Sequence, residues 1–325
     1  MDAALEYYNS NYIYTGFQIN RINYDNVSEN ISSRNTSDYG SEKTFDNKIG
    51  IIIDIFTLVI CFIGLVGNGI VIWLLGFCIK KNPFITYILN LAIADFGLLV
   101  TLIFAIISSW LIILYGYTNV FFLVSLFLFL STHSASQFLL IAISIDRCVA
   151  VFFPLWHQCH RPPRLSTIVC AAVWVLSFLL STITCSILKV NPTGSMVQLF
   201  YQFIVNAVLC LPLMTIATVA LFLKVCFKVQ HNQRGKLLTI ILLTLLCFVL
   251  LVFPLNVIYI LYIYNYVPSY VPSCAMVLSC INSSVNPVIY FLVGRQWKTK
   301  QKETMKMILQ RVFREEQGCT EKSQL

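Results

Sequence analysis

Two charged residues, Asp146 and Arg147, stand near the end of an apolar segment that runs from about residue 120 to residue 149. A charge at membrane depth costs about 2.5–3.5 kcal/mol on insertion scales, so such residues are rare and usually functional. Arg147 keeps its proton, and its planar guanidinium can hold a carboxylate or backbone carbonyl groups. The pair is therefore a candidate functional ionic contact. The alternative is that it only marks where a helix leaves the bilayer.

A second candidate group combines one carboxylate with several neutral oxygen atoms. Asp95 lies within an apolar segment, and polar groups at membrane depth must find partners inside a bundle. The residues expected around it share amide or hydroxyl groups: Asn68, Ser136, Asn282, Ser283 and Asn286. Hard cations prefer oxygen ligands, so this cluster would suit Na⁺. It would equally suit a network of water molecules, and the sequence leaves both open.

The segments that position these residues are long and apolar. The chain has 325 residues, of which 58% are hydrophobic and 11% charged, whereas soluble domains carry about 25% charged residues. Seven runs reach the ~20 residues that a helix needs to cross a bilayer. They lie at about 50–77, 84–111, 120–149, 166–188, 197–226, 237–262 and 270–293. We expect an all-α membrane protein, a bundle of seven transmembrane helices.

Basic residues set the expected orientation. Of the 22 lysines and arginines, 17 fall in the loops on one side of the seven runs and in the C-terminal segment. That side should face the cytoplasm, which places the N-terminus outside and the C-terminus inside. The net charge of +8 is therefore a topology signal and does not indicate nucleic-acid binding.

The two ends differ in character. Residues 1–48 are polar and aperiodic, which predicts a disordered extracellular tail, and sequons at Asn26, Asn30 and Asn35 predict N-glycosylation there. Residues 1–20 contain no apolar core, so we expect no cleavable signal peptide.

After the bundle at 49–294, residues 295–325 carry an apolar stripe with a basic opposite face. This pattern predicts an amphipathic helix on the anionic inner leaflet, followed by a short cytoplasmic tail.

Three of the apolar runs contain proline: Pro212, Pro254 and Pro287. Each proline removes a backbone hydrogen bond and bends its helix. Kinked helices indicate a bundle that can bend rather than a rigid pore. Asn286, Pro287 and Tyr290 place an amide, a kink and a phenol together near the inner end of the last helix.

One landmark per helix occurs in order along the chain. The set comprises Gly67-Asn68, Ala94-Asp95, Asp146-Arg147-Cys148, Trp174, Pro212, Pro254 and Asn286-Pro287 with Tyr290. In this order and spacing the chain resembles the rhodopsin-like (class A) G-protein-coupled receptors over residues 50–315. The second inner loop from Pro154 to Pro162, and the segment from Ile281 to Gly294, resemble those of the Mas and Mas-related receptors.

This resemblance implies an extracellular ligand, a peptide or a small molecule, and a heterotrimeric G protein as partners. It implies that Asp146, Arg147, Cys148, Tyr290 and the prolines take part in coupling and activation. Arrestin binding, the ligand and the G-protein class stay open. The cysteine that many class A receptors carry at the outer end of helix 3 corresponds to Phe122, and we expect no disulfide, no metal and no cofactor other than Na⁺.

The expected ligand pocket is aromatic and nearly neutral. The amine-binding aspartate of aminergic receptors corresponds to Phe129, and the outer loops contain no acid. Candidate pocket residues are Phe129, His133, Tyr201, Tyr259 and Tyr262, although aromatic residues at these depths also form the interfacial belt of membrane proteins. Residues 224–250 contain no acid, so Arg147 is expected to have only Asp146 to pair with. That predicts appreciable activity without ligand.

Other classes fit less well. A class A receptor for a lipid or an odorant-like apolar ligand is the alternative within receptors. A transporter would need ionisable groups along a pathway, and few are present. No nucleophile–base pair or metal-ligand spacing indicates an enzyme.

Overall fold

The computed structural model describes residues 36–79, 82–115, 120–162, 164–190, 195–227 and 271–294, together with positions 243, 246, 250, 251, 254 and 307. In this part of the chain the structure is helical. The helices are α3 (Thr36–Trp73), η2 (Leu74–Cys78), α4 (Pro83–Tyr115), α5 (Val120–Phe152), α6 (Pro154–Cys159), α7 (Leu165–Val190), α8 (Ser195–Phe227) and α10 (Val271–Gly294).

Five of the described helices are long and apolar enough to cross a membrane. The spans are Ile49–Cys78, Pro83–Ser108, Val124–Phe152, Leu165–Ile187 and Gln202–Lys224, which confirms the first five predicted runs to within a few residues. The predicted seventh run coincides with α10, whose apolar part Met276–Phe291 is shorter. The sixth run, at 237–262, and the predicted C-terminal amphipathic helix lie outside the described residues except for single positions.

The first helix differs from the prediction at both ends. Helix α3 begins at Thr36, so residues 36–48, which we expected in the extracellular tail, are helical. At the other end its last turn widens into the π-helix η2, which no sequence pattern announced. The sequons at Asn26, Asn30 and Asn35 lie outside the described residues.

Local sequence explains where some helices begin. The Asn82 side chain accepts a hydrogen bond of 2.7 Å from the Ile85 backbone N–H, and Pro83 occupies the first helical position of α4. A capping asparagine followed by proline is a strong start signal, because proline has no N–H to leave unpaired in the first turn. Pro154 likewise occupies the first turn of the short helix α6, which has no side-chain cap.

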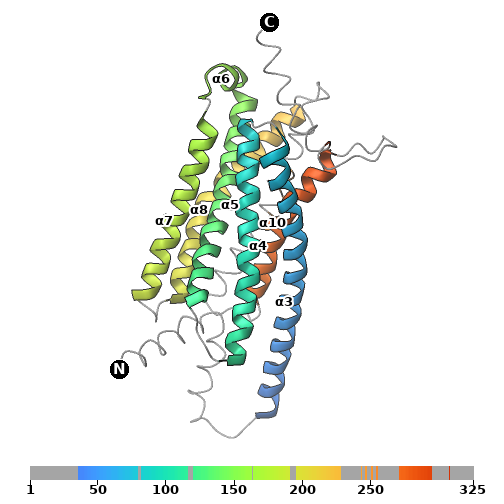
Figure 1. Cartoon of the computed structure of the whole chain (residues 1–325), viewed down its shortest axis with the longest axis vertical. Helices are drawn as coiled ribbons and strands as arrows, with labels where there is room; N and C mark the ends of the chain where they lie inside the picture. Colours follow the sequence, from blue (N-terminus) through green and yellow to red (C-terminus); the bar gives the residue numbers. More distant parts are fainter. Residues whose placement is uncertain are drawn as a thin grey trace, which may run out of the picture.

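Helix α5 is the centre of the bundle. It packs against α4, α7 and α8, while α3 packs against α4 and α10 (Figure 1). Most of the α5 span is buried, whereas little of α3 is. The candidate ionic contact, Asp146 with Arg147, therefore lies on the most buried of the described spans.

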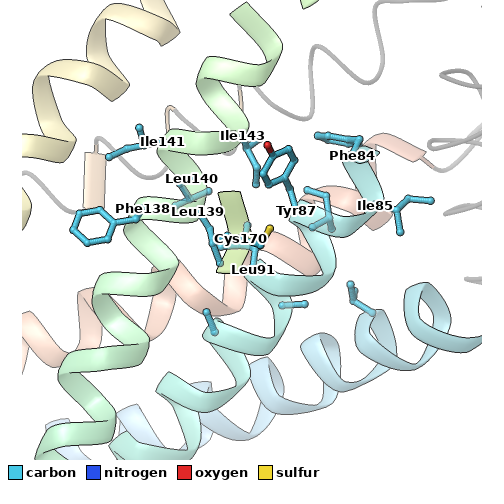
Figure 2. Packing of buried hydrophobic residues seen from close by; sticks show 14 of the residues in the cluster. Phe84, Ile85, Tyr87, Leu91, Phe138, Leu139, Leu140, Ile141, Ile143 and Cys170 are labelled. Carbon is cyan, nitrogen blue, oxygen red and sulfur yellow. The ribbon is translucent and has the colours of Figure 1, made fainter. Parts of the chain in front are cut away.

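Aliphatic and aromatic side chains fill the space between α4, α5 and α7 (Figure 2). Leu91, Leu139, Leu140 and Cys170 are almost fully buried there. Lipid tails are as apolar as leucine, so in a bilayer this packing stabilises through van der Waals contact rather than through removal of surface from water. The polar contacts between helices therefore contribute a larger share of specificity than they would in a soluble domain.

One glycine marks a close approach of helices α3 and α10. A Cβ atom built on Gly67 would lie 3.1 Å from Pro287 Cβ. The first and last described spans thus meet beside Asn68, which brings polar residues far apart in sequence into one layer.

Candidate functional site

The Asp146–Arg147 pair is buried near the C-terminal end of α5. Arg147 Nη2 donates a hydrogen bond of 2.5 Å to Asp146 Oδ2, and the two side chains are 5% and 7% exposed. The guanidinium carbon of Arg147 also lies 4.1 Å from the centre of the Phe84 ring on α4. Burial of both partners favours a held ionic contact over a pair that only marks the helix end, because solvated surface pairs contribute little.

Asp146 has a second partner that the sequence analysis missed. Arg161 Nη2 lies 2.7 Å from Asp146 Oδ1, so each carboxylate oxygen faces a different guanidinium. We expected Arg147 to have only Asp146 to pair with, and Asp146 is its ion-pair partner among the residues that the structure describes. The sequence did not indicate that Asp146 is shared with Arg161 or that Arg147 also stacks on the Phe84 ring. Arg161 lies fifteen positions after Asp146 and beyond the end of α5, so helical periodicity could not place it beside Asp146.

Cys148, the third residue of the motif, faces a different neighbour. Its Sγ lies 3.8 Å from the Ala217 carbonyl oxygen of α8. The motif thus links α5 to α4, to the second inner loop and to α8.

The predicted oxygen-rich cluster assembles around Asp95, which is fully buried. Ser136 Oγ of α5 donates a hydrogen bond of 2.7 Å to Asp95 Oδ1. Asn286 Nδ2 of α10 donates one of 2.8 Å to Asp95 Oδ2. Three helices therefore meet at one carboxylate through neutral donors.

Asn68 joins the same layer through backbone groups. Its Nδ2 donates hydrogen bonds of 3.0 Å to the carbonyl oxygens of Gly64 and Ser283. Its Oδ1 is buried without a hydrogen-bond partner among the described residues. Asn282 is buried beside Ser283 but shows no bond to Asp95 in this part of the chain.

The predicted prolines and Tyr290 have different surroundings. Pro212 lies inside α8 and Pro287 inside α10. Tyr290 is buried one turn beyond Pro287, and Pro254 is a single described helical residue that is exposed. Tyr290 thus lies in the hydrophobic core that contains Tyr87, Ile143 and Met214.

Of the predicted pocket residues, the structure describes the side chains of Phe129 and His133. The His133 ring packs 5.7 Å from that of Phe129 and 5.2 Å from that of Phe203, measured between ring centres. His133 Nε2 also lies 2.8 Å from Gln137 Nε2. The side chains of Tyr201, Tyr259 and Tyr262 lie outside the described residues.

A polar group between α5, α7 and α8 was also missed. Gln202 Nε2 donates hydrogen bonds of 3.0 Å to Ser134 Oγ and 3.2 Å to Ser181 Oγ, and Asn206 Nδ2 donates one of 2.8 Å to Ser134 Oγ. The spacing of Gln202 and Asn206, one helical turn apart in an apolar run, was a signal that could have revealed it.

No group of three or more histidine, cysteine, aspartate or glutamate side chains that could hold a metal occurs among the residues that the structure describes. The nine cysteines whose side chains the structure describes are free thiols.

The candidate site consists of two layers. One is ionic, near the C-terminal end of α5, and the other is made of neutral hydrogen bonds around Asp95.

The chain is similar to proteins of a known family. The family model described as 7 transmembrane receptor (rhodopsin family) matches residues 67–290. The chain is 33% identical to the proto-oncogene Mas of Rattus norvegicus over 78% of this chain and 81% of that protein. It is 36% identical to the Mas-related G-protein coupled receptor member H of Mus musculus, over 86% and 88% of the two chains. Member F of Homo sapiens is 36% identical over 79% of this chain and 77% of the relative.

Proposed function

This chain belongs to the rhodopsin family of seven-transmembrane receptors, as a Mas-related G-protein-coupled receptor, and from that premise we propose that it activates its G protein through Asp146, Arg147 and Cys148. The family implies an extracellular ligand, a G protein and a multi-pass position in the plasma membrane, and its members are receptors and not enzymes. The observation that carries the assignment to these residues is the buried ion pair at the inner end of the central helix.

The proposed mechanism is a shift between two states of the bundle. In the resting state Arg147 is held by Asp146 and lies on the Phe84 ring. A ligand that binds one state more tightly favours release of Arg147, which together with Tyr290 then contributes to a groove for the G protein. Each proline interrupts the backbone hydrogen-bond ladder of its helix, so bending costs the least free energy at these positions: Pro212, Pro254 and Pro287.

Ligand-free activity follows from the same picture. Residues 224–250 contain no acid that could hold Arg147 from the sixth helix. We expect measurable activation of one G-protein class without ligand. The test compares wild type with Arg147→Ala at matched surface levels across all G-protein classes in cells. A receptor that is silent in every class at good surface expression would refute the proposal of ligand-free activity.

The complete topology is part of the proposal. Seven spans occupy residues 49–294, residues 1–48 are extracellular and residues 295–325 lie on the cytoplasmic side, beginning with an amphipathic helix on the lipid surface. The five described spans and the excess of basic residues on one side support it. Glycosylation at Asn26, Asn30 and Asn35 would put the N-terminus outside. Removal of N-glycans should lower the apparent mass of wild type but not of a variant with glutamine at all three positions.

A sodium ion at Asp95 is also proposed. The donor set fits a hard cation, because a fully buried carboxylate meets the Ser136 hydroxyl, and the Asn68 amide oxygen is without a partner among the described residues. When bound, the ion would supply positive charge to the carboxylate, and Asp95, Ser136 and Asn68 would hold it. Asn282, Ser283 and Asn286 complete the proposed group.

The ligand is proposed to be apolar or weakly charged. The Phe129, His133 and Phe203 rings form an aromatic cluster, and Asp54 of the first span is already bonded to the Trp110 indole at 3.0 Å. Polybasic peptides should therefore be poor agonists. A basic peptide that activates at low concentration and is insensitive to Asp54→Asn would contradict this.

Arrestin is a further proposed partner, with weak recruitment. The C-terminal segment offers few hydroxyl side chains for phosphorylation: Thr299, Thr304, Thr320 and Ser323. Recruitment measured with and without these four residues replaced by alanine should differ little.

A further inference from the structure

Asp146 is shared by two arginines that belong to different parts of the chain. Its Oδ2 faces Arg147 at 2.5 Å and its Oδ1 faces Arg161 at 2.7 Å. The three side chains are between 5% and 8% exposed. This places one negative charge between two positive charges in a region largely shielded from water.

Arg161 is fixed by contacts that do not involve Arg147. Its Nη1 lies 2.7 Å from His157 Nε2, at the last turn of α6, and its Nη2 lies 2.8 Å from Ser166 Oγ, in the first turn of α7. His157 Nε2 is itself 3.7 Å from Asp146 Oδ1. The guanidinium is thus oriented by groups before and after it in the chain, and neither of these contacts involves Arg147.

We propose that Arg161 is a positioning residue for activation, which holds Asp146 when Arg147 leaves and so favours the signalling state. While Arg147 is paired with Asp146, Arg161 weakens that ion pair, because two like charges compete for one carboxylate. Once Arg147 has left, a buried carboxylate without a partner would cost several kcal/mol. Arg161 removes that penalty.

Although Arg161 competes with Arg147 for Asp146, its loss should keep the receptor in the resting state. Arg161→Gln is expected to lower ligand-free activation by a factor of about three, and Arg161→Lys by less. Asp146→Asn, which frees Arg147, should raise it. In the Asp146→Asn background the Arg161→Gln change should have no further effect, because the shared carboxylate is absent.

The experiment uses full-length receptor fused to a Gα subunit, so that coupling does not depend on an identified ligand. Nucleotide exchange in membranes is measured for wild type, the variants above and Arg164→Gln at equal receptor levels. Arg164 is the matched control, because it lies three residues after Arg161, carries the same charge and is exposed. A rise or no change with Arg161→Gln, or the same fall with Arg164→Gln, would overturn the proposal.

A second readout separates contact from signalling. Thermal unfolding of the purified single and double variants gives a double-mutant cycle for Arg161 and Asp146, and positive coupling is expected. Additive effects would overturn the proposal even if exchange falls. The inference rests on the proposed role of Arg147. If Arg147→Ala shows the same nucleotide exchange as wild type in every fusion, the role of Arg147 is refuted, and the proposal for Arg161 with it. The unfolding cycle still reports on the contact between Arg161 and Asp146 alone.

Discussion

Asp95 and Asp146 are the same residue type buried at two depths of one bundle, and their partners differ completely. The Asp95 carboxylate meets a serine hydroxyl and an asparagine amide, so its described direct hydrogen-bond donors are neutral. The Asp146 carboxylate meets two guanidinium groups. A carboxylate among neutral donors can accept a cation from outside, whereas one already paired with arginines can only exchange partners. The first arrangement suits ion binding and the second suits a switch.

The largest expected effect is loss of the carboxylate between the arginines. Asp146→Ala leaves Arg147 and Arg161 buried without a counter-charge, which should lower stability by about 3–5 kcal/mol. Thermal unfolding of purified receptor measures it, with Asp146→Asn as the milder control that keeps an acceptor. Equal stability of Asp146→Ala and wild type would show that the arginines reach water when the pair is broken.

The next effect tests the ion-binding side of the comparison. Sodium at about ten times its Kd should stabilise wild type by about 1.4 kcal/mol relative to a bulky organic cation at equal ionic strength. Asp95→Asn should abolish this difference, whereas Asp146→Asn should retain it. The same sodium response in Asp95→Asn as in wild type would remove Asp95 from the ion site.

A single neutral hydrogen bond should matter less. Ser136→Ala removes the donor to Asp95 Oδ1 and should cost about 1 kcal/mol. The measurement is the shift in thermal unfolding of the purified variant. Ser144→Ala is a suitable control, because that hydroxyl bonds to the Leu140 carbonyl of its own helix and to a methionine sulfur. A loss with Ser144→Ala as large as with Ser136→Ala would argue against a special role for the Asp95 layer.

The smallest effect is expected where the first two spans meet through Asp54 and Trp110. Trp110→Phe removes the hydrogen bond from the indole of this exposed residue to the half-buried Asp54, and should change stability by less than about 1 kcal/mol. Asp54→Asn should change stability even less, since an amide oxygen can still accept from the indole. A cost comparable to that of Asp146→Ala would mean that the charge contrast between depths is not what decides stability.

Periodicity and length were sufficient for the membrane spans. An apolar run of membrane length has one stable outcome in lipid, a helix with every backbone group paired inside the segment. The five described spans therefore agree with the sequence to within a few residues. The early start of α3 at Thr36 and the π-helical turn η2 were not predictable in this way, because polar residues and local widening leave no apolar pattern.

The candidate site was predictable where one residue stands alone in an apolar run. Asp95, Asn68 and Arg147 are conspicuous for that reason, and the structure joins Asp95 to Ser136 and Asn286 as expected. In the sequence, Arg161 is one of many basic residues between the spans. Its contact with Asp146 depends on how α6 and the residues after it lie against α5, and that arrangement follows from tertiary contacts that no sequence period encodes.

Coupling through Arg147 is measured most directly as nucleotide exchange by a purified G protein with receptor reconstituted in lipid discs. Wild type, Arg147→Ala and the control Arg164→Gln are compared in the absence of ligand, with the G-protein class chosen from the cell assay. Coupling through the Asp146–Arg147 pair predicts exchange above the receptor-free rate for wild type and Arg164→Gln, and at the receptor-free rate for Arg147→Ala. Exchange by Arg147→Ala equal to wild type would contradict coupling through the Asp146–Arg147 pair.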